Sequence, residues 1–153
     1  MDAEITYRTV TTIEECVQAQ NIQLDVWGEN ELHVMSWRLF LDLVRNGGLV
    51  LGAFDGDQMV GFNVGFLGTD QESPNRPAMA RLKFNSHAMG VRPDYQDAGI
   101  GYRLKLMQRE YAIENGVRLI TWTYDPLQSR NANLNIRRLG RFVTITFANI
   151  MGR

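Results

Sequence analysis

Hydrophobic and polar positions follow two different periods along the first third of this chain. Residues 5–10 alternate and are rich in β-branched side chains, which predicts a strand. Helical spacing follows over residues 12–27 and again over residues 34–44. Thr12 and Glu15 have the spacing of a capping box, so the first helix should begin there, and the polar, glycine-rich run at 46–48 should end the second.

The middle of the chain predicts a hairpin. Two apolar runs, 49–54 and 59–67, flank an Asp-Gly turn at residues 55–58. Gly61 and Gly65 weaken the second run as a strand, unless another part of the chain approaches the backbone closely or the strand is bulged. Residues 69–77 are polar and predict a loop, which either borders a site or is plain surface.

The second half predicts a strand at 82–91, a glycine loop and a helix from about 100 to 115. Ile100, Leu104, Met107 and Tyr111 recur at helical spacing along that helix. A strand at 117–124, a short helix from Ser129 to Gly140 and a last strand at 142–147 complete the order β-α-α-β-β-β-α-β-α-β. The fold class is therefore α/β (mixed α+β), with helices on both faces of a mixed sheet.

Composition narrows the class of protein further. The 153 residues fit one domain, 1–153, and 16 basic against 17 acidic residues give no drive toward nucleic acid or anionic lipid. No apolar run approaches the ~18 residues that span a membrane, and no targeting segment is recognisable, so we expect a cytoplasmic protein. The pattern around Cys16, the single cysteine, predicts a small core residue. The chain has two histidines, His33 and His87, and no recognisable cluster of metal ligands, so no metal site is expected. Arginines are concentrated in the last quarter of the chain, where they either form a solvated surface or contact a polyphosphate ligand.

The glycine loop carries the strongest chemical signal. Two glycines where a helix begins expose several backbone N–H groups, and the helix dipole adds positive potential there. Such a loop suits a phosphate. A dinucleotide-binding fingerprint would need a small residue where Leu104 stands, and a P-loop would need Gly-Lys-Ser/Thr, so neither motif is present.

The run Gln96-x-x-Gly99-x-Gly101, preceded by Val91-x-Pro93, resembles the signature of the GNAT acetyltransferase superfamily, and the order of elements matches over almost the whole chain. The resemblance implies acetyl-CoA or another acyl-CoA as co-substrate. It places Met89 and Val91 along pantetheine, with Gly90 as a bulge between them, and Asn131 either beside the CoA arm or as a simple helix-start residue. The pyrophosphate would be bound by loop residues Gln96, Asp97, Ala98, Gly99, Ile100, Gly101 and Tyr102.

Three departures from the family pattern affect the expected site. Asp97 and Ala98 stand where many relatives have glycine and a basic residue, so the loop is less electropositive. Ile136 stands where relatives commonly carry a tyrosine that serves as acid. Only 13 residues follow Gly140, so the C-terminal hairpin is expected to be incomplete, through truncation or through completion by another chain, such as in a homodimer.

The resembled family transfers the acyl group by direct attack of an amine within a ternary complex. His87 is the candidate base because its ordinary pKa suits proton removal near neutrality, although a strand histidine can also be purely structural. Tyr124 is the candidate acid, unless it only packs against the following helix. The expected function is N-acyl transfer to a small-molecule amine, and the alternative is a non-catalytic acyl-CoA-binding or interaction module.

Overall fold

The computed structural model describes residues 4–28 and 34–122. Each predicted element within these ranges is present, and two short 3-10 helices join them, η2 (Ala78–Arg81) and η3 (Pro93–Tyr95). The helices and strands in chain order are β1 (Thr6–Thr9), α1 (Ile13–Trp27), α2 (Trp37–Arg45), β2 (Leu49–Asp55), β3 (Gln58–Thr69), β4 (Leu82–Val91), α3 (Ile100–Glu114) and β5 (Ile120–Trp122).

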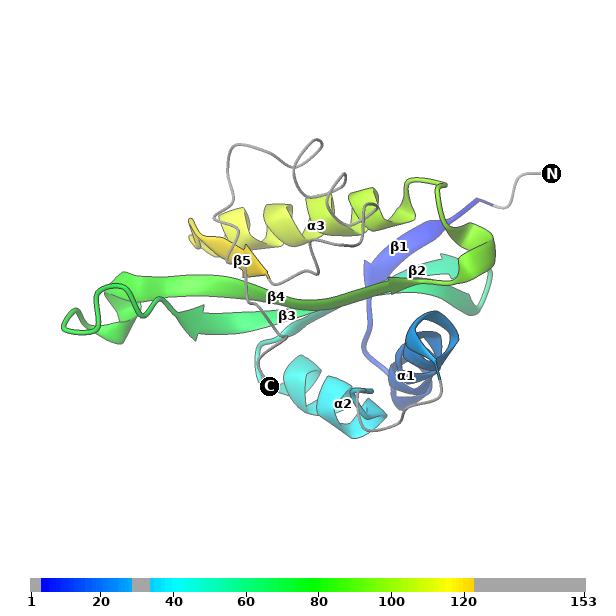
Figure 1. Cartoon of the computed structure of the whole chain (residues 1–153), viewed down its shortest axis with the longest axis horizontal. Helices are drawn as coiled ribbons and strands as arrows, with labels where there is room; N and C mark the ends of the chain where they lie inside the picture. Colours follow the sequence, from blue (N-terminus) through cyan, green and yellow to red (C-terminus); the bar gives the residue numbers. More distant parts are fainter. Residues whose placement is uncertain (1–3, 29–33, 123–153) are drawn as a thin grey trace.

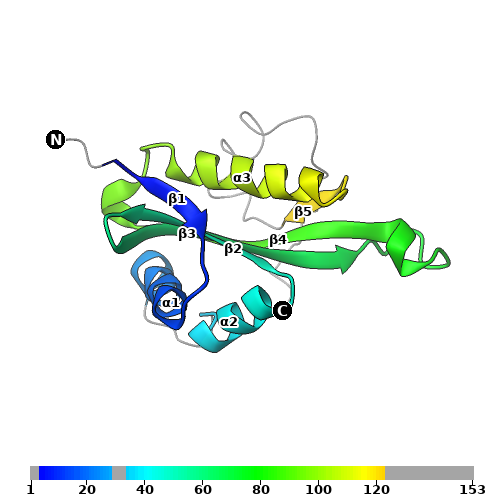
Figure 2. The same cartoon turned by 180° about the vertical axis from the view of Figure 1, so that it is seen from behind.

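The sheet follows the sequence order, β1-β2-β3-β4-β5. Its first four strands pair antiparallel, and β5 pairs parallel with β4 through α3. Helices α1 and α2 cover one face and α3 covers the other (Figures 1 and 2). This arrangement confirms the predicted mixed, mostly antiparallel sheet with helices on both faces.

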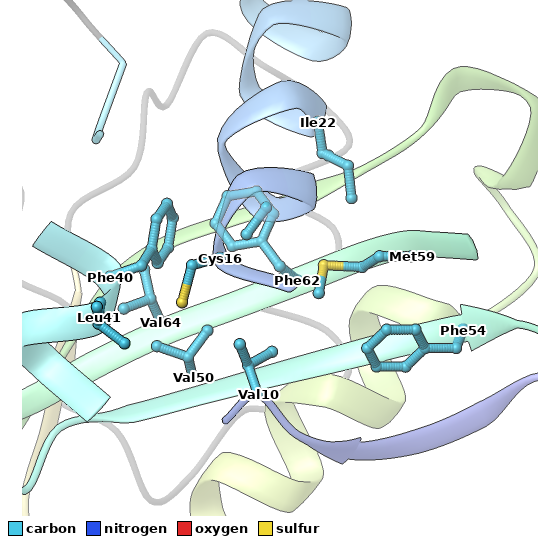
Figure 3. Close-up of a cluster of buried hydrophobic side chains, with 11 residues drawn as sticks. Val10, Cys16, Ile22, Phe40, Leu41, Val50, Phe54, Met59, Phe62 and Val64 are labelled. Carbon is cyan, nitrogen blue, oxygen red and sulfur yellow. The ribbon is translucent and has the colours of Figure 1, made fainter. Parts of the chain in front are cut away.

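Each face of the sheet has its own hydrophobic core. Beneath α1 and α2, Phe40 and Phe62 meet edge to face with ring centroids 5.6 Å apart, and Cys16 is fully buried beside them, as predicted (Figure 3). Beneath α3, the core is built around Phe84 and Leu104, both fully buried. The double-sided burial explains why β2 reads as a continuous apolar run rather than an alternating one.

Local signals set the helix starts. Thr12 caps α1 and forms the predicted capping box with Glu15, whose carboxylate also pairs with Arg8 and accepts the backbone N–H of Thr11. Burial by itself raises the pKa of Glu15, but these hydrogen bonds outweigh it and hold the pKa below its ordinary value. Helix α2 begins later than the predicted residue 34, because the Ser36 side chain accepts the N–H that opens its first turn.

The two glycines of β3 mark close approaches, which is one of the two alternatives that the sequence left open. A Cβ at Gly61 would lie 3.1 Å from Cγ2 of Ile100, so this glycine lets α3 pack tightly on the sheet. A Cβ at Gly65 would overlap the ring of Phe84 on the neighbouring strand. The packing of α3 on the sheet therefore needs a glycine at position 61, and the packing of Phe84 against β3 needs a glycine at position 65.

Several predictions fall outside the described residues. They are the helix expected at 129–140, the strand expected at 142–147 and the incomplete C-terminal hairpin. The positions of Tyr124, Asn131 and Ile136 also lie outside the described residues. Within the described ranges, no helix has the length and apolarity that crossing a bilayer would require.

Candidate active site

Two side-chain hydrogen bonds anchor the loop between β4 and α3 to the sheet. The Gln96 side chain donates from Nε2 to the Val91 carbonyl over 3.0 Å, which holds the loop to the end of β4. The Tyr95 hydroxyl donates to Oδ2 of Asp55 over 2.7 Å, which holds it to β2, and this bond raises the pKa of Tyr95. The loop is therefore fixed to two neighbouring parts of the sheet before the helix begins.

Two residues of the loop have left-handed backbone conformations. Gly99 has a φ of 80°, and Asp97 has a φ of 67°, the single positive φ of a non-glycine residue within the described chain. Aspartate tolerates this region better than most residues do. Alternation of right- and left-handed residues turns successive N–H groups toward one side and forms a concave anion site. Asp97 thus adopts a backbone shape that glycine takes without strain, which accounts structurally for this departure from the family pattern.

The first turn of α3 is open to a ligand. Gly99 is its N-cap and offers no side chain to the helix, and residues 97–99 are exposed. No other heavy atom lies within 4 Å of the position of a Cβ on Gly99. The next residue, Ile100, is buried and anchors the helix on β3. A helix N-terminus held in this way presents its N–H groups and its positive dipole end to an anion.

The last residues of β4 form one edge of the candidate site. Met89 and Val91 are half-buried and pair with Asn63 and Gly61 of β3. On the opposite edge, β5 pairs with residues 84–86 of β4, and no strand of the described chain pairs beyond Ser86. The backbone of residues 87–91 can therefore accept an extended ligand within this part of the structure.

The bulge of β4 lies at His87, so the prediction of a bulge at Gly90 is wrong. Val64 pairs with Ala88 and Gly65 pairs with Ser86, which leaves His87 as the extra residue. Gly90 pairs regularly with Phe62, and its missing Cβ makes room for that ring. The bulge also interrupts the regular alternation of side chains between the two faces of β4.

His87 lies on the surface beside the bulge. Its side chain is exposed, and its ring centroid is 5.8 Å from that of Phe66 on β3. The structure places it at the same edge region as Met89, two residues along the strand. The other catalytic candidate, Tyr124, and the CoA-arm candidate, Asn131, lie outside the described residues.

The sequence patterns did not predict a cluster of buried polar side chains that lies under α3. Lys105 donates from Nζ to Oγ of Ser86, and Gln108 donates from Nε2 to Oδ1 of Asn63. Burial lowers the pKa of Lys105 to about 7. Gln108 follows Leu104 by four residues and Lys105 by three, so helical spacing places it beside the predicted apolar stripe. The buried residues of α3 are Ile100, Leu104, Lys105, Gln108 and Ala112, and Met107 and Tyr111 of the predicted stripe are partly buried against the same core.

Over residues 4–28 and 34–122, no group of three or more histidine, cysteine, aspartate or glutamate side chains is placed to hold a metal ion. The chemistry offered by the described site is that of backbone N–H groups, a helix N-terminus and one exposed imidazole.

Comparison with known proteins identifies the family. A family model described as "Acetyltransferase (GNAT) family" matches residues 16–140, and no curated protein matches the sequence. Similar solved structures include an aminoglycoside acetyltransferase from an uncultured soil metagenomic sample in complex with trehalose, with a TM-score of 0.79 and 13% identity over 99% of this chain and 97% of that chain. An aminoglycoside N-acetyltransferase in complex with CoA has a TM-score of 0.74 and 12% identity, covering 100% and 96%. A transcriptional regulator from Bacillus halodurans C-125 has a TM-score of 0.71 and 19% identity, covering 90% and 93%.

These structural neighbours share the fold at low identity, and the family model covers most of the chain. The family match and the shared fold are consistent with the glycine loop between β4 and α3 and with the strand order of the sheet. The chain therefore belongs to the GNAT family of acetyltransferases.

Proposed function

We propose that this protein transfers an acetyl or other acyl group from acyl-CoA to the amine of a small molecule, by direct attack in a ternary complex. The observation that carries the proposal is the β4–α3 loop, in which two left-handed residues, Asp97 and Gly99, lead into a helix N-terminus without a side-chain cap. That geometry suits the pyrophosphate of CoA. A structural neighbour that was crystallised with CoA supports the same ligand.

The remaining parts of the site have roles that follow from their positions. Backbone N–H groups of residues 96–102 would bind the pyrophosphate, and the free edge of β4 at Met89 and Val91 would pair with the amides of pantetheine. A backbone N–H near the bulge would stabilise negative charge on the thioester oxygen as the amine attacks. The new C–N bond forms as the C–S bond breaks, the proton lost by the amine goes to a base, and the departing thiolate takes up a proton from an acid.

His87 is proposed as the residue that accepts the amine proton. Its imidazole is exposed beside the bulge, so a bound acceptor could reach it. An amine acceptor is supported by two neighbours whose names describe aminoglycoside acetyltransferases, one in complex with CoA and one in complex with trehalose. The proposed acceptor class is a small molecule rather than nucleic acid or a membrane.

Two glycines at opposite ends of α3 provide a matched test of the CoA loop. Gly99 and Gly116 have φ values of 80° and 71°, and nothing lies within 4 Å of a Cβ on either. Alanine at each should cost about 1–2 kcal/mol of stability for the left-handed conformation. Gly99→Ala should also lower CoA affinity at least tenfold in calorimetry, because its methyl group would occupy the approach to the pyrophosphate. Gly116→Ala should bind CoA like the wild type.

Equal CoA affinity of the two variants, or a folded wild type that binds neither CoA nor acyl-CoA, would contradict the proposed cofactor site. Catalysis needs a separate assay, in which release of CoA thiol is followed with a panel of amines. The exposed carboxylate of Asp97 in the loop favours the alternative, a non-catalytic acyl-CoA-binding module. Binding of acyl-CoA without thiol release on any amine would support that alternative.

A further inference from the structure

A cavity of about 550 Å³ lies between the C-terminal half of α3 and the segment that leads into β5. This volume is within the ordinary range of small-molecule sites. It is separate from the CoA loop, because Lys105, the first of its lining residues in the chain, follows Gly99 by six residues, or about 9 Å along the helix. The residues that line it are Lys105, Gln108, Arg109, Ala112, Ile113, Gly116, Val117, Arg118, Ile120 and Trp122.

The walls combine apolar surface with positive charge. Ala112, Val117 and Trp122 are buried and apolar. Arg109 and Arg118 bring guanidinium groups from α3 and from the segment before β5, and no carboxylate is among the lining residues. A ligand that matches these walls has an apolar body and a negative charge.

Lys105 provides the anchor for that charge. Only 8% of its surface is exposed, its Nζ donates to Ser86, and Nζ lies 5.0 Å from the ring centroid of Trp122. Among the described residues, no carboxylate forms an ion pair with it. Removing a charged amine from water without a counter-ion is costly, and here the cost lowers the pKa to about 7.

A second observation points to the same ligand chemistry. The indole N–H of Trp122 and the side-chain amide nitrogen of Asn63 are buried and have no acceptor within the described chain. Both groups are hydrogen-bond donors, and Trp122 lines the cavity. Two buried donors near Lys105 therefore lack an acceptor that a carboxylate could supply, and the Thr121 hydroxyl is also without a partner within the described chain.

We propose that this cavity binds an organic carboxylate with a medium-length apolar chain, and that the carboxylate forms an ion pair with Lys105. The apolar chain would lie against Ala112, Val117 and Trp122. The proposal does not depend on acyl-CoA binding, because none of its residues belongs to the 96–102 loop.

Binding of this kind has a specific proton signature. Near pH 8 Lys105 is mostly neutral, so a carboxylate that pairs with its charged form must bring a proton into the complex. Affinity should fall as the pH rises above 7. The other charged groups that line the cavity are Arg109 of α3 and Arg118 before β5, and the facing side chains of Ser86, Asn63 and Gln108 carry no titratable group.

The test uses octanoate as the anionic probe and octanol as the neutral one. Calorimetry at pH 8 in two buffers of different ionisation enthalpy gives both the affinity and the number of protons taken up. Wild type should take up close to one proton per octanoate and bind octanol at least tenfold more weakly. Lys105→Met should lose at least tenfold in octanoate affinity together with the proton uptake. Lys83→Met, which removes the one other lysine of the chain, should behave like the wild type.

A measurement on the wild type keeps the test valid if Lys105→Met does not fold. With ¹³C-labelled lysine, octanoate should shift the Lys105 Cε signal and raise the pKa measured from it. The proposal is overturned if octanoate does not bind, if it binds without proton uptake or without moving that signal, if octanol binds as tightly, or if folded Lys105→Met binds octanoate like the wild type.

Discussion

Lys105 should make this protein more stable as the pH rises above neutrality. Its amine is buried under α3, and that burial lowers its pKa to about 7, whereas an unfolded lysine has a pKa of about 10.4. Between these two values the unfolded chain binds a proton that the folded chain does not. The free energy of unfolding therefore increases with pH in this window, and below pH 7 both states carry the proton and the dependence on this group disappears.

The size of the effect follows from the two pKa values. Between pH 7 and pH 9 the contribution of Lys105 to the free energy of unfolding should rise by about 2 kcal/mol. At pH 7 the buried amine costs about 4 kcal/mol, and replacing it with methionine removes that cost while losing a hydrogen bond to Ser86 that is worth about 1 kcal/mol. Lys105→Met should therefore be more stable than the wild type at pH 7, by on the order of 3 kcal/mol.

Two experiments measure these quantities directly. Urea unfolding of wild type and Lys105→Met at pH 7 and pH 9 gives the difference in stability, which should shrink by about 2 kcal/mol at the higher pH because all other titrating groups cancel. NMR of protein carrying ¹³C-labelled lysine gives the pKa itself. The chain has two lysines, so a Lys83→Met variant assigns the signals and serves as the control in both experiments.

A Lys105 pKa close to the ordinary lysine value of about 10.4 would refute this reasoning, since it would mean that the amine reaches water in solution. A stability difference that is the same at both pH values would refute it too. A variant that is less stable than wild type at pH 7 would show that the hydrogen bond to Ser86 outweighs the cost of burial.

Three further substitutions test other parts of the structure. Gly65→Ala should destabilise the protein by about 1–3 kcal/mol in denaturant unfolding because its methyl group would overlap the ring of Phe84. Gly68→Ala should change little, because its methyl group would meet Cε of Lys83 at an ordinary contact distance of 3.9 Å. Similar losses in both variants would contradict the packing argument. Thr12→Ala should cost about 1 kcal/mol through loss of the α1 cap, and an unchanged unfolding midpoint would show that this cap contributes nothing. His87→Ala should lower turnover more than CoA affinity, and unchanged turnover would remove His87 from the proposed mechanism.

The parts of the fold that sequence patterns predicted are those that depend on neighbours in the chain. The start of α1 follows from Thr12 and Glu15, which are three residues apart, and the turn before β3 follows from an Asp-Gly pair. The β4–α3 loop is equally local: Gly99 supplies the left-handed N-cap, and Gln96 fastens the loop to Val91 five residues away. Spacing along the chain is enough to specify such features, because their hydrogen bonds close within one or two turns.

Tertiary structure alone decided where β4 bulges and what α3 buries. The sequence predicted a bulge at Gly90, but this glycine pairs regularly with β3 and leaves room for the ring of Phe62. The register with β3 makes His87 the extra residue instead. Lys105 lies outside the apolar stripe predicted for this helix, yet close packing of α3 on the sheet takes its amine out of water. Register and burial are set by side chains far apart in sequence, whose approach becomes visible only when the sheet is assembled. The sequence by itself thus determined the order of the described elements and the shape of the β4–α3 loop. The fold decided which polar groups lie at the bulge of β4 and beneath α3.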